Sequence, residues 1–249
     1  MRVRKILIIV VLVIVLASVS ASAEVRGVAA SPHATGVTCG LPESNARALI
    51  IMNNYYQSSG HYSWDHTDLT VAVQAHPSAT AEQLAALHGA IATWKAVIDD
   101  CFDGQITLTD VTGTQPSEQR AADIVIHFVP TGLGFSAGGR ATCGDHGCPN
   151  VFIRSDFPPG LYDPPYGQYS PRELGLVTTH ELGHALGLGH ATNLWESNDL
   201  MGYGWNTYPM SEPVLSDCDV DALAFVFAWV FEGSEPYVPA EGPYDCSLD

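Results

Sequence analysis

The amino-acid sequence predicts an α+β fold built around one hydrophobic core, and three observations predict it. Short segments rich in β-branched residues, with alternating apolar and polar positions, recur through the middle of the chain, as expected for strands. Longer segments carry apolar residues at helical spacing behind clear N-terminal caps. The 249 residues are 46% hydrophobic and 15% charged, which suits a globular chain with one core.

The first residues have the features of an export signal. Three basic residues among the first five precede an apolar run from Ile6 to about Ala17, and Ala21-Ser22-Ala23 is an A-x-A cleavage signal. An uncleaved membrane anchor is the alternative, but about 20 apolar residues are needed to span a bilayer and this run is shorter. We therefore expect residues 1–23 to be a signal peptide and the protein to be secreted.

The exported chain is expected to be strongly acidic. The formal net charge is −17, and the signal peptide holds three positive charges and no negative ones, so its removal leaves −20. Nucleic-acid binding needs a basic surface, so we expect no nucleic-acid partner.

The first strand and helix follow a stretch without clear periodicity, residues 24–62, which we interpret as an N-terminal extension or short pro-segment. Leu69 to Val73 is the first predicted strand, with Trp64 packed near its start. Thr80 begins a helix, because Thr80 and Gln83 form a capping box. Its core-facing stripe consists of Leu84, Leu87, Ile91, Trp94 and Ile98.

Four more strands are predicted before the second helix. They span Ile106 to Val111, Asp123 to Val129, about Ser136 to Thr142 and Val151 to Arg154.

Two further helices are predicted from their caps. Ser170 is an N-cap, Pro171 is at the first helical position, and Glu173 completes a capping box. The last helix is capped by Ser216, with Asp219 three residues on, and runs to about Phe231.

The second helix leads into the segment Thr179 to His190, which contains H-E-x-x-H-x-x-G-x-x-H with every specified position filled. Residues four apart share one face of a helix, so His180 and His184 can present two imidazoles to one metal ion. Glu181 lies about 100° round from His180, where its carboxylate can reach a metal-bound water without being a ligand. The pattern predicts a catalytic zinc site with Glu181 as general base.

The third ligand requires the chain to turn. Continued helix would carry His190 roughly 240° round and about 9 Å along the axis from His184. Gly187 readily adopts the left-handed conformation that ends a helix, so the chain can bring His190 back to the metal. Three neutral imidazoles then leave one tetrahedral position for water, as in catalytic zinc sites. The alternative is a histidine-rich helix end without metal, and chance would produce this motif in roughly one of ten thousand such chains.

The motif, with Met201 eleven residues beyond His190, resembles that of the metzincin clan of zinc endopeptidases. Within the clan the chain is similar to matrixins: Ala122 to Phe128 resembles their third strand, and Asp219 matches an aspartate that braces their methionine turn. The resemblance implies a metzincin catalytic domain at 63–231, followed by an acidic, Pro-rich tail at 232–249.

This resemblance makes the expected fold more specific. It implies a twisted, mostly parallel sheet of about five strands, with two helices packed on it and a C-terminal helix after the methionine turn. The segment Ser136 to Thr142 would be an antiparallel edge strand above the cleft, where an extended peptide adds to the sheet and places its scissile bond over the metal.

The function that the resemblance implies is secreted, zinc-dependent endopeptidase activity on protein or peptide substrates. One Zn²⁺ would acidify water and polarise the scissile carbonyl, while Glu181 takes the water proton and passes it to the leaving amine. Met201 would form a hydrophobic floor. We expect a monomer without stable membrane association once the signal is removed. The alternative is a non-catalytic zinc-binding or adhesive module, although such a site would not need Glu181.

Tyr203 departs from the matrixin pattern, which usually has proline there. Astacins and serralysins have a tyrosine at this place, so Tyr203 is a candidate fifth zinc ligand and hydrogen-bond donor to the oxyanion. A wall residue of the substrate pocket is the alternative.

The six cysteines of an exported chain allow three disulfides. Cys143 is paired with Cys148, because these two bracket a tight loop. Cys218 with Cys246 would hold the tail to the domain, and Cys39 with Cys101 is the pair that remains. Cys39-Gly40-Leu41-Pro42-Glu43 also resembles the cysteine switch of matrixins, in which a pro-segment thiolate occupies the open zinc position. Both interpretations of Cys39 remain open.

Matrixins also carry structural calcium and a second zinc. The residues that could bind such an ion here are His127, Asp145, His146, Asp156 and Asp163. The alternative is that they are solvated polar residues of loops.

Overall fold

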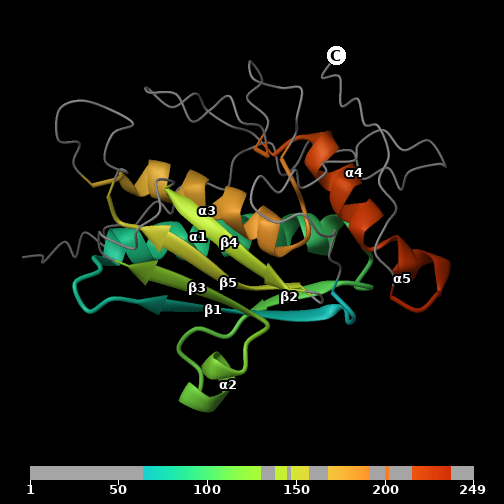
Figure 1. Ribbon diagram of the computed structural model, residues 1–249, viewed down its shortest axis with the longest axis horizontal. Helices are drawn as coiled ribbons and strands as arrows, with labels where there is room; N and C mark the ends of the chain where they lie inside the picture. Colours follow the sequence, from blue (N-terminus) through green and yellow to red (C-terminus); the bar gives the residue numbers. More distant parts are fainter. Residues whose placement is uncertain are drawn as a thin grey trace, which may run out of the picture.

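The computed structural model describes residues 64–129, 138–144, 147–156, 168–190, 200–201 and 215–236. These residues form an α+β fold in which two long helices lie side by side on one face of a five-stranded sheet (Figure 1). None of the described helices combines the length and apolar character needed to cross a membrane.

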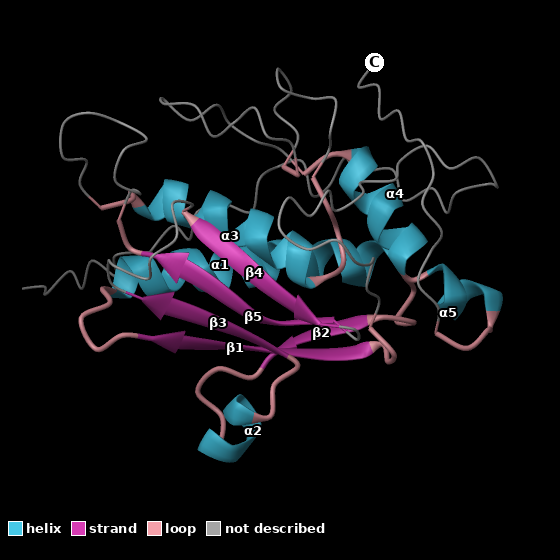
Figure 2. Ribbon diagram, viewed as in Figure 1, coloured by secondary structure: helices cyan, strands magenta, loops and turns pink. Residues whose placement is uncertain are grey.

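The sheet confirms the expected number and direction of strands. Its members are β1 (Asp68–Ala75), β2 (Thr107–Asp110), β3 (Ile124–Val129), β4 (Gly139–Gly144) and β5 (Gly147–Arg154). Their spatial order is β2-β1-β3-β5-β4 (Figure 2). The first four in this order pair in parallel, and β4 pairs antiparallel with β5. β4 is therefore an antiparallel strand at one edge of the sheet, as predicted.

The first long helix, α1 (Ala81–Cys101), begins where the sequence predicts. The Thr80 hydroxyl accepts from the Gln83 amide at 3.2 Å, and the Gln83 side chain accepts from the Thr80 amide at 2.9 Å. The predicted stripe is buried except for Leu84, which is only partly buried at the edge of the core. Small residues of the same face, such as Ala86 and Ala90, let α1 approach α3 closely.

The connection between β4 and β5 is shorter than the predicted strand limits imply. The pairing extends to Gly144 opposite Gly147, so β4 runs two residues further and β5 begins four residues earlier than expected. Gly147 has φ +115°, and a Cβ there would lie 2.7 Å from the Trp64 ring. Both the backbone conformation and the packing therefore require glycine at this turn.

A short helix, α2 (Pro116–Arg120), joins β2 to β3 and was not predicted. Proline at its first turn is the sequence signal that could have revealed it.

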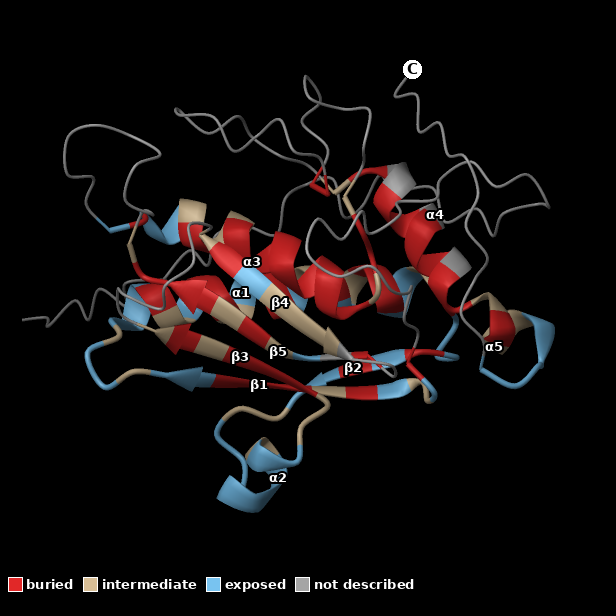
Figure 3. Cartoon of the chain, in the orientation of Figure 1, coloured by how far each residue is buried: buried red, intermediate tan, exposed pale blue. Residues whose placement is uncertain are grey.

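The second long helix, α3 (Pro171–Ala185), confirms its predicted start. The Ser170 hydroxyl accepts from the Glu173 amide, and the Glu173 carboxylate accepts from the Ser170 amide. Its residues from Val177 onward are buried (Figure 3). α3 is thus held between α1 and the β4–β5 edge of the sheet.

The prediction of a single last helix is wrong. The chain forms α4 (Asp217–Val226) and α5 (Ala228–Glu232), separated at Phe227, whose φ of −101° and ψ of 19° leave the helical region. The predicted cap is present, since the Ser216 hydroxyl accepts from the Asp219 amide. The sequence has no glycine or proline between α4 and α5, so nothing local indicates this break.

The structure shows two of the six cysteines to be in disulfides, and the three predicted pairings remain predictions. Cys101 and Cys143 are both disulfide-bonded. Cys143 precedes Gly144 on β4 and Cys148 follows Gly147 on β5, next to the last pair of the hairpin. Cys39 and Cys246 lie outside the described residues, as do the side chains of Cys148 and Cys218.

Candidate metal centre

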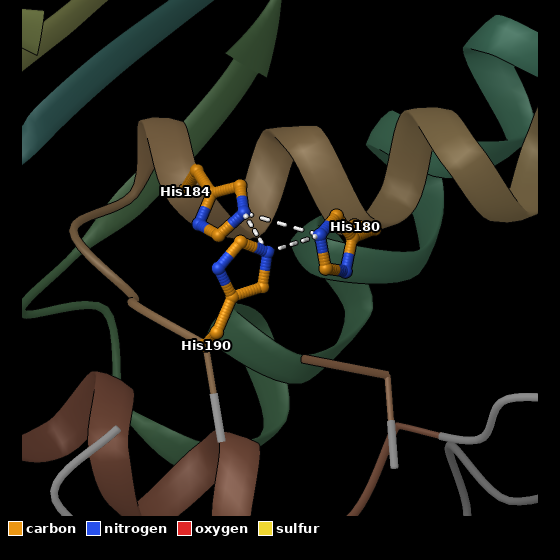
Figure 4. Close-up of side chains that lie close together, drawn as sticks. All are labelled: His180, His184 and His190. Carbon is orange, nitrogen blue, oxygen red and sulfur yellow. Dashed lines mark hydrogen bonds between the residues drawn. The ribbon is translucent and has the colours of Figure 1, made fainter. Parts of the chain in front are cut away.

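Three histidine side chains meet at the C-terminal end of α3 (Figure 4). The Nε2 atom of His184 lies 3.1 Å from that of His180 and 3.2 Å from that of His190, and the remaining Nε2 pair is 3.2 Å apart. His180 and His184 are buried, and His190 is partly buried. The three residues predicted as metal ligands therefore form one nearly equilateral triangle of nitrogens.

Helix geometry and one glycine produce this triangle. His180 and His184 are one turn apart on α3, as the motif predicts. Gly187 has φ +110°, and its amide donates to the His184 carbonyl while the Leu188 amide donates to the Gly183 carbonyl. This pair of bonds is the Schellman ending of a helix. The predicted left-handed turn at Gly187 is confirmed, and it returns His190 to the site.

The outer nitrogens of two of these imidazoles fix the tautomers. His180 Nδ1 donates to the Leu200 carbonyl at 2.7 Å, and His184 Nδ1 donates to the Leu188 carbonyl at 2.8 Å. A carbonyl can only accept, so both Nδ1 atoms carry the proton and both Nε2 atoms carry a lone pair. Two lone pairs that face each other at 3.1 Å repel unless a cation lies between them.

The donor set fits a tetrahedral metal ion. A Zn–N bond of about 2.0–2.1 Å at the tetrahedral angle separates two ligand nitrogens by about 3.3–3.4 Å. The three Nε2 separations of 3.1–3.2 Å are close to that value. The residues present can therefore hold a metal ion with three protein ligands and one position left over.

Burial keeps these imidazoles neutral. It lowers the pKa of His180 to about 3 and that of His184 to about 4, and it moves the pKa of His190 far below its usual range. The charge of a neighbouring imidazolium adds to the effect at His180 and His190. Neutral imidazole is the form that binds metal, so the site is ready to bind at neutral pH.

Glu181 follows His180 on α3, and its side chain lies against the edge strand β4. It is 8% exposed, and its carboxylate accepts a hydrogen bond from the Ala141 amide of β4. Burial raises the pKa of Glu181 to about 8, while the Ala141 amide and the charge of Arg140 act in the opposite direction. A bound divalent cation would lower this pKa further, because it favours the carboxylate.

Gly139 makes room for Glu181. A Cβ at Gly139 would lie 2.8 Å from the Glu181 carboxyl carbon, a distance that real Cβ contacts do not show. Sequence analysis missed this residue. Two successive glycines within a predicted strand are the signal that could have revealed a close approach at this point.

Two tryptophans donate hydrogen bonds to backbone carbonyls of α3. The indole of Trp94 on α1 donates to the Thr179 carbonyl at 2.8 Å, and the indole of Trp64 donates to the Ala185 carbonyl at 2.9 Å. The sequence indicated only that both would be packed in the core. Their hydrogen bonds hold the backbone at both ends of the His180 to His184 segment.

Met201 packs against the turn between His180 and His184. It is fully buried, and a Cβ at Gly183 would lie 2.6 Å from its sulfur and 3.1 Å from the Trp94 ring. The absent side chain of Gly183 therefore lets Met201 lie directly against α3. This placement agrees with the expected hydrophobic support beneath the metal site.

We expect Gly183→Ala to lower the free energy of unfolding by about 1–3 kcal/mol, the usual cost of overpacking a core. Gly175→Ala, on the same helix, is the matched control: its Cβ would meet the Ala86 carbonyl at 3.7 Å and the Ala86 Cβ at 4.0 Å, which are ordinary contacts. That control should be neutral or stabilising by up to about 1 kcal/mol, because alanine favours helix. Urea unfolding of both variants measures the difference, and equal stabilities would contradict the packing of Met201 on Gly183.

The remaining predicted site residues are not brought together in the described part of the chain. His127 Nε2 is bonded to the Asn150 side chain at 2.9 Å, and Asp156 pairs with Arg154. Among the described residues the three-histidine group is the one cluster able to bind metal. Asp145, His146, Asp163, Tyr203 and the Cys39 segment lie outside the described residues.

Comparison with known protein families finds none that matches this chain, and comparison with curated proteins finds no matching protein.

Proposed function

We propose that the protein is a secreted, zinc-dependent endopeptidase of the metzincin type. One observation carries the proposal: three imidazole Nε2 atoms converge within 3.1–3.2 Å, and the next residue after the first of these histidines is a buried glutamate. A site used only to hold metal would not need Glu181, whose burial as a carboxylate is costly.

Each residue of the site has a distinct part in this proposal. His180, His184 and His190 would hold the zinc ion, which supplies Lewis acidity toward water and toward a peptide carbonyl when bound. Glu181 takes the proton of the attacking water and donates it to the leaving amine. Its pKa is raised by burial and lowered by the hydrogen bond from the Ala141 amide and by the charge of Arg140.

The edge strand supports the assignment to peptide substrates. Arg154 of β5 donates its amide to the Gly138 carbonyl, and the register then directs the N–H and C=O groups of Gly139 and Ala141 away from β5. These groups lie on the side of β4 that contacts Glu181. An extended peptide added along this edge would place its backbone beside the proposed general base.

The test uses the purified protein without its signal peptide. We expect it to bind about one zinc ion per chain and to cleave an unfolded protein, with activity lost to a chelator and restored by added zinc. Zinc content by atomic absorption and cleavage by mass spectrometry are the two measurements. A zinc-loaded protein that leaves every unfolded substrate intact would instead support the non-catalytic module.

A further inference from the structure

Arg140 is an exposed positive charge on the edge strand of an acidic protein. The chain carries 27 Asp and Glu against 10 Lys and Arg. Lys95 and Arg154 are each paired with an aspartate, whereas no ion pair to a carboxylate is found for Arg140 among the residues that the structure describes. Its exposed guanidinium on β4 is therefore available to a partner from outside the described part.

The strand geometry determines where the Arg140 side chain lies. Neighbouring residues of a strand point to opposite faces of the sheet. The Cβ direction of Gly139 meets Glu181, so Gly139 faces the helix side. Arg140 must then face the other side, in the row that contains its cross-strand partner Phe152 and, beyond it, His127.

An added peptide strand would have one residue directly opposite Arg140. The outward hydrogen-bonding groups of β4 belong to Gly139 and Ala141, so Arg140 lies at a non-hydrogen-bonded position of the new pair. At such positions the two side chains share a face and their Cβ atoms lie about 4.5–5.5 Å apart. The next side chains of the peptide on that face lie about 7–8 Å away.

We propose that Arg140 selects substrates that carry Asp or Glu at the single position opposite it on the β4 edge. This inference rests on the proposed endopeptidase function and makes its substrate class more specific. The selected position lies close to the scissile bond, because the neighbouring residues Gly139 and Ala141 both contact Glu181.

The experiment compares peptides that differ in one residue, with Asp, Asn or Lys placed in turn at each position around a fixed cleavage site. An exposed cross-strand charge pair is worth about 0.2–1 kcal/mol, so kcat/KM for Asp should exceed that for Asn by about 1.4- to 5-fold at one position only. Lys at that position should be disfavoured. The Asp over Asn ratio should approach one in 1 M salt, where the Debye length is about 3 Å.

Three variants test whether the preference for Asp depends on Arg140. Arg140→Gln should abolish the Asp over Asn ratio, and Arg140→Glu should invert the preference toward Lys. Arg120→Gln removes an exposed positive charge on α2. This helix contacts β1, which β3 and β5 separate from β4, so the variant should leave the ratio unchanged. Zinc content of each variant checks that the domain is folded.

The outcomes separate the two proposals. Cleavage without a preference for Asp, or a preference that persists in Arg140→Gln, would overturn the role of Arg140 and leave the endopeptidase proposal standing. A zinc-loaded wild-type protein that cleaves none of the peptides would overturn the endopeptidase proposal, and this inference with it.

Discussion

Glu181→Gln is expected to lower kcat about 10²- to 10⁴-fold, the usual contribution of a general acid–base group, while zinc content stays near one ion per chain. Glutamine has nearly the same shape and can occupy the space beside Gly139, so the fold and the three imidazoles should be preserved. It cannot take a proton from water. Turnover of an unfolded protein substrate, measured together with zinc content, checks this result.

Glu173→Gln is the matched control for Glu181→Gln. It makes the same chemical change on the same helix, at a half-buried position where glutamine can also complete the capping box with Ser170. This control should retain full activity. Equal activity of Glu181→Gln and the wild-type protein would exclude Glu181 as the base.

The metal-free form of Glu181→Gln gives a second measurement. Burial raises the pKa of Glu181 from 4.5 to about 8, so the carboxyl of the folded protein stays protonated while that of the unfolded chain ionises. The stability that this carboxyl contributes is therefore full below about pH 4.5 and is lost as pH rises toward 8. Glutamine does not ionise, so the metal-free variant should be more stable than metal-free wild type at pH 7 and should lose this advantage near pH 4.

His190→Ala should have the second large effect, on zinc affinity. His190 is the one ligand outside α3, and its removal opens the triangle without altering the helix. Removal of a group that only orients a metal ligand lowers metal affinity about 10- to 100-fold. We expect removal of the ligand itself to lower zinc affinity by more than this. Proteolytic activity at limiting zinc should fall in parallel.

The control for His190→Ala removes a different imidazole. His88 on α1 is exposed and pairs with Asp110, away from the metal-binding residues. His88→Ala should bind zinc like the wild-type protein in a competition titration with a chromophoric chelator. A His190→Ala protein that retained wild-type affinity would show that the Nε2 triangle does not hold the metal.

The arrangement of the three histidines could be predicted from sequence because it depends on residues close together in the chain. Spacing on one helix sets His180 and His184, and the conformational freedom of Gly187 sets the return of His190. The same holds for the capping boxes at Thr80 and Ser170, where a bond to a residue three positions away fixes the helix start.

The features that sequence reasoning missed depend on contacts between distant segments. Gly139 matters because Glu181, 42 positions along, lies against it, and the Trp94 indole reaches a carbonyl 85 residues away. Phe227 leaves the helical conformation although no glycine or proline lies beside it in the sequence. Pattern and propensity carry no information on such pairings, which are decided when the layers pack.

For the proposed secreted enzyme, the hydrogen bond from the Trp64 indole to the Ala185 carbonyl bears on where the N-terminal segment can be cut. Trp64 precedes the first strand, and its ring also covers Gly147 at the turn of the β4–β5 hairpin. A maturation cut beyond Trp64 would remove this donor from the last turn of the metal-binding helix and uncover the hairpin. If the proposed endopeptidase function is correct, we expect the N-terminus of the active form to lie before Trp64, and the proposed catalytic domain to begin at this tryptophan rather than at the start of β1.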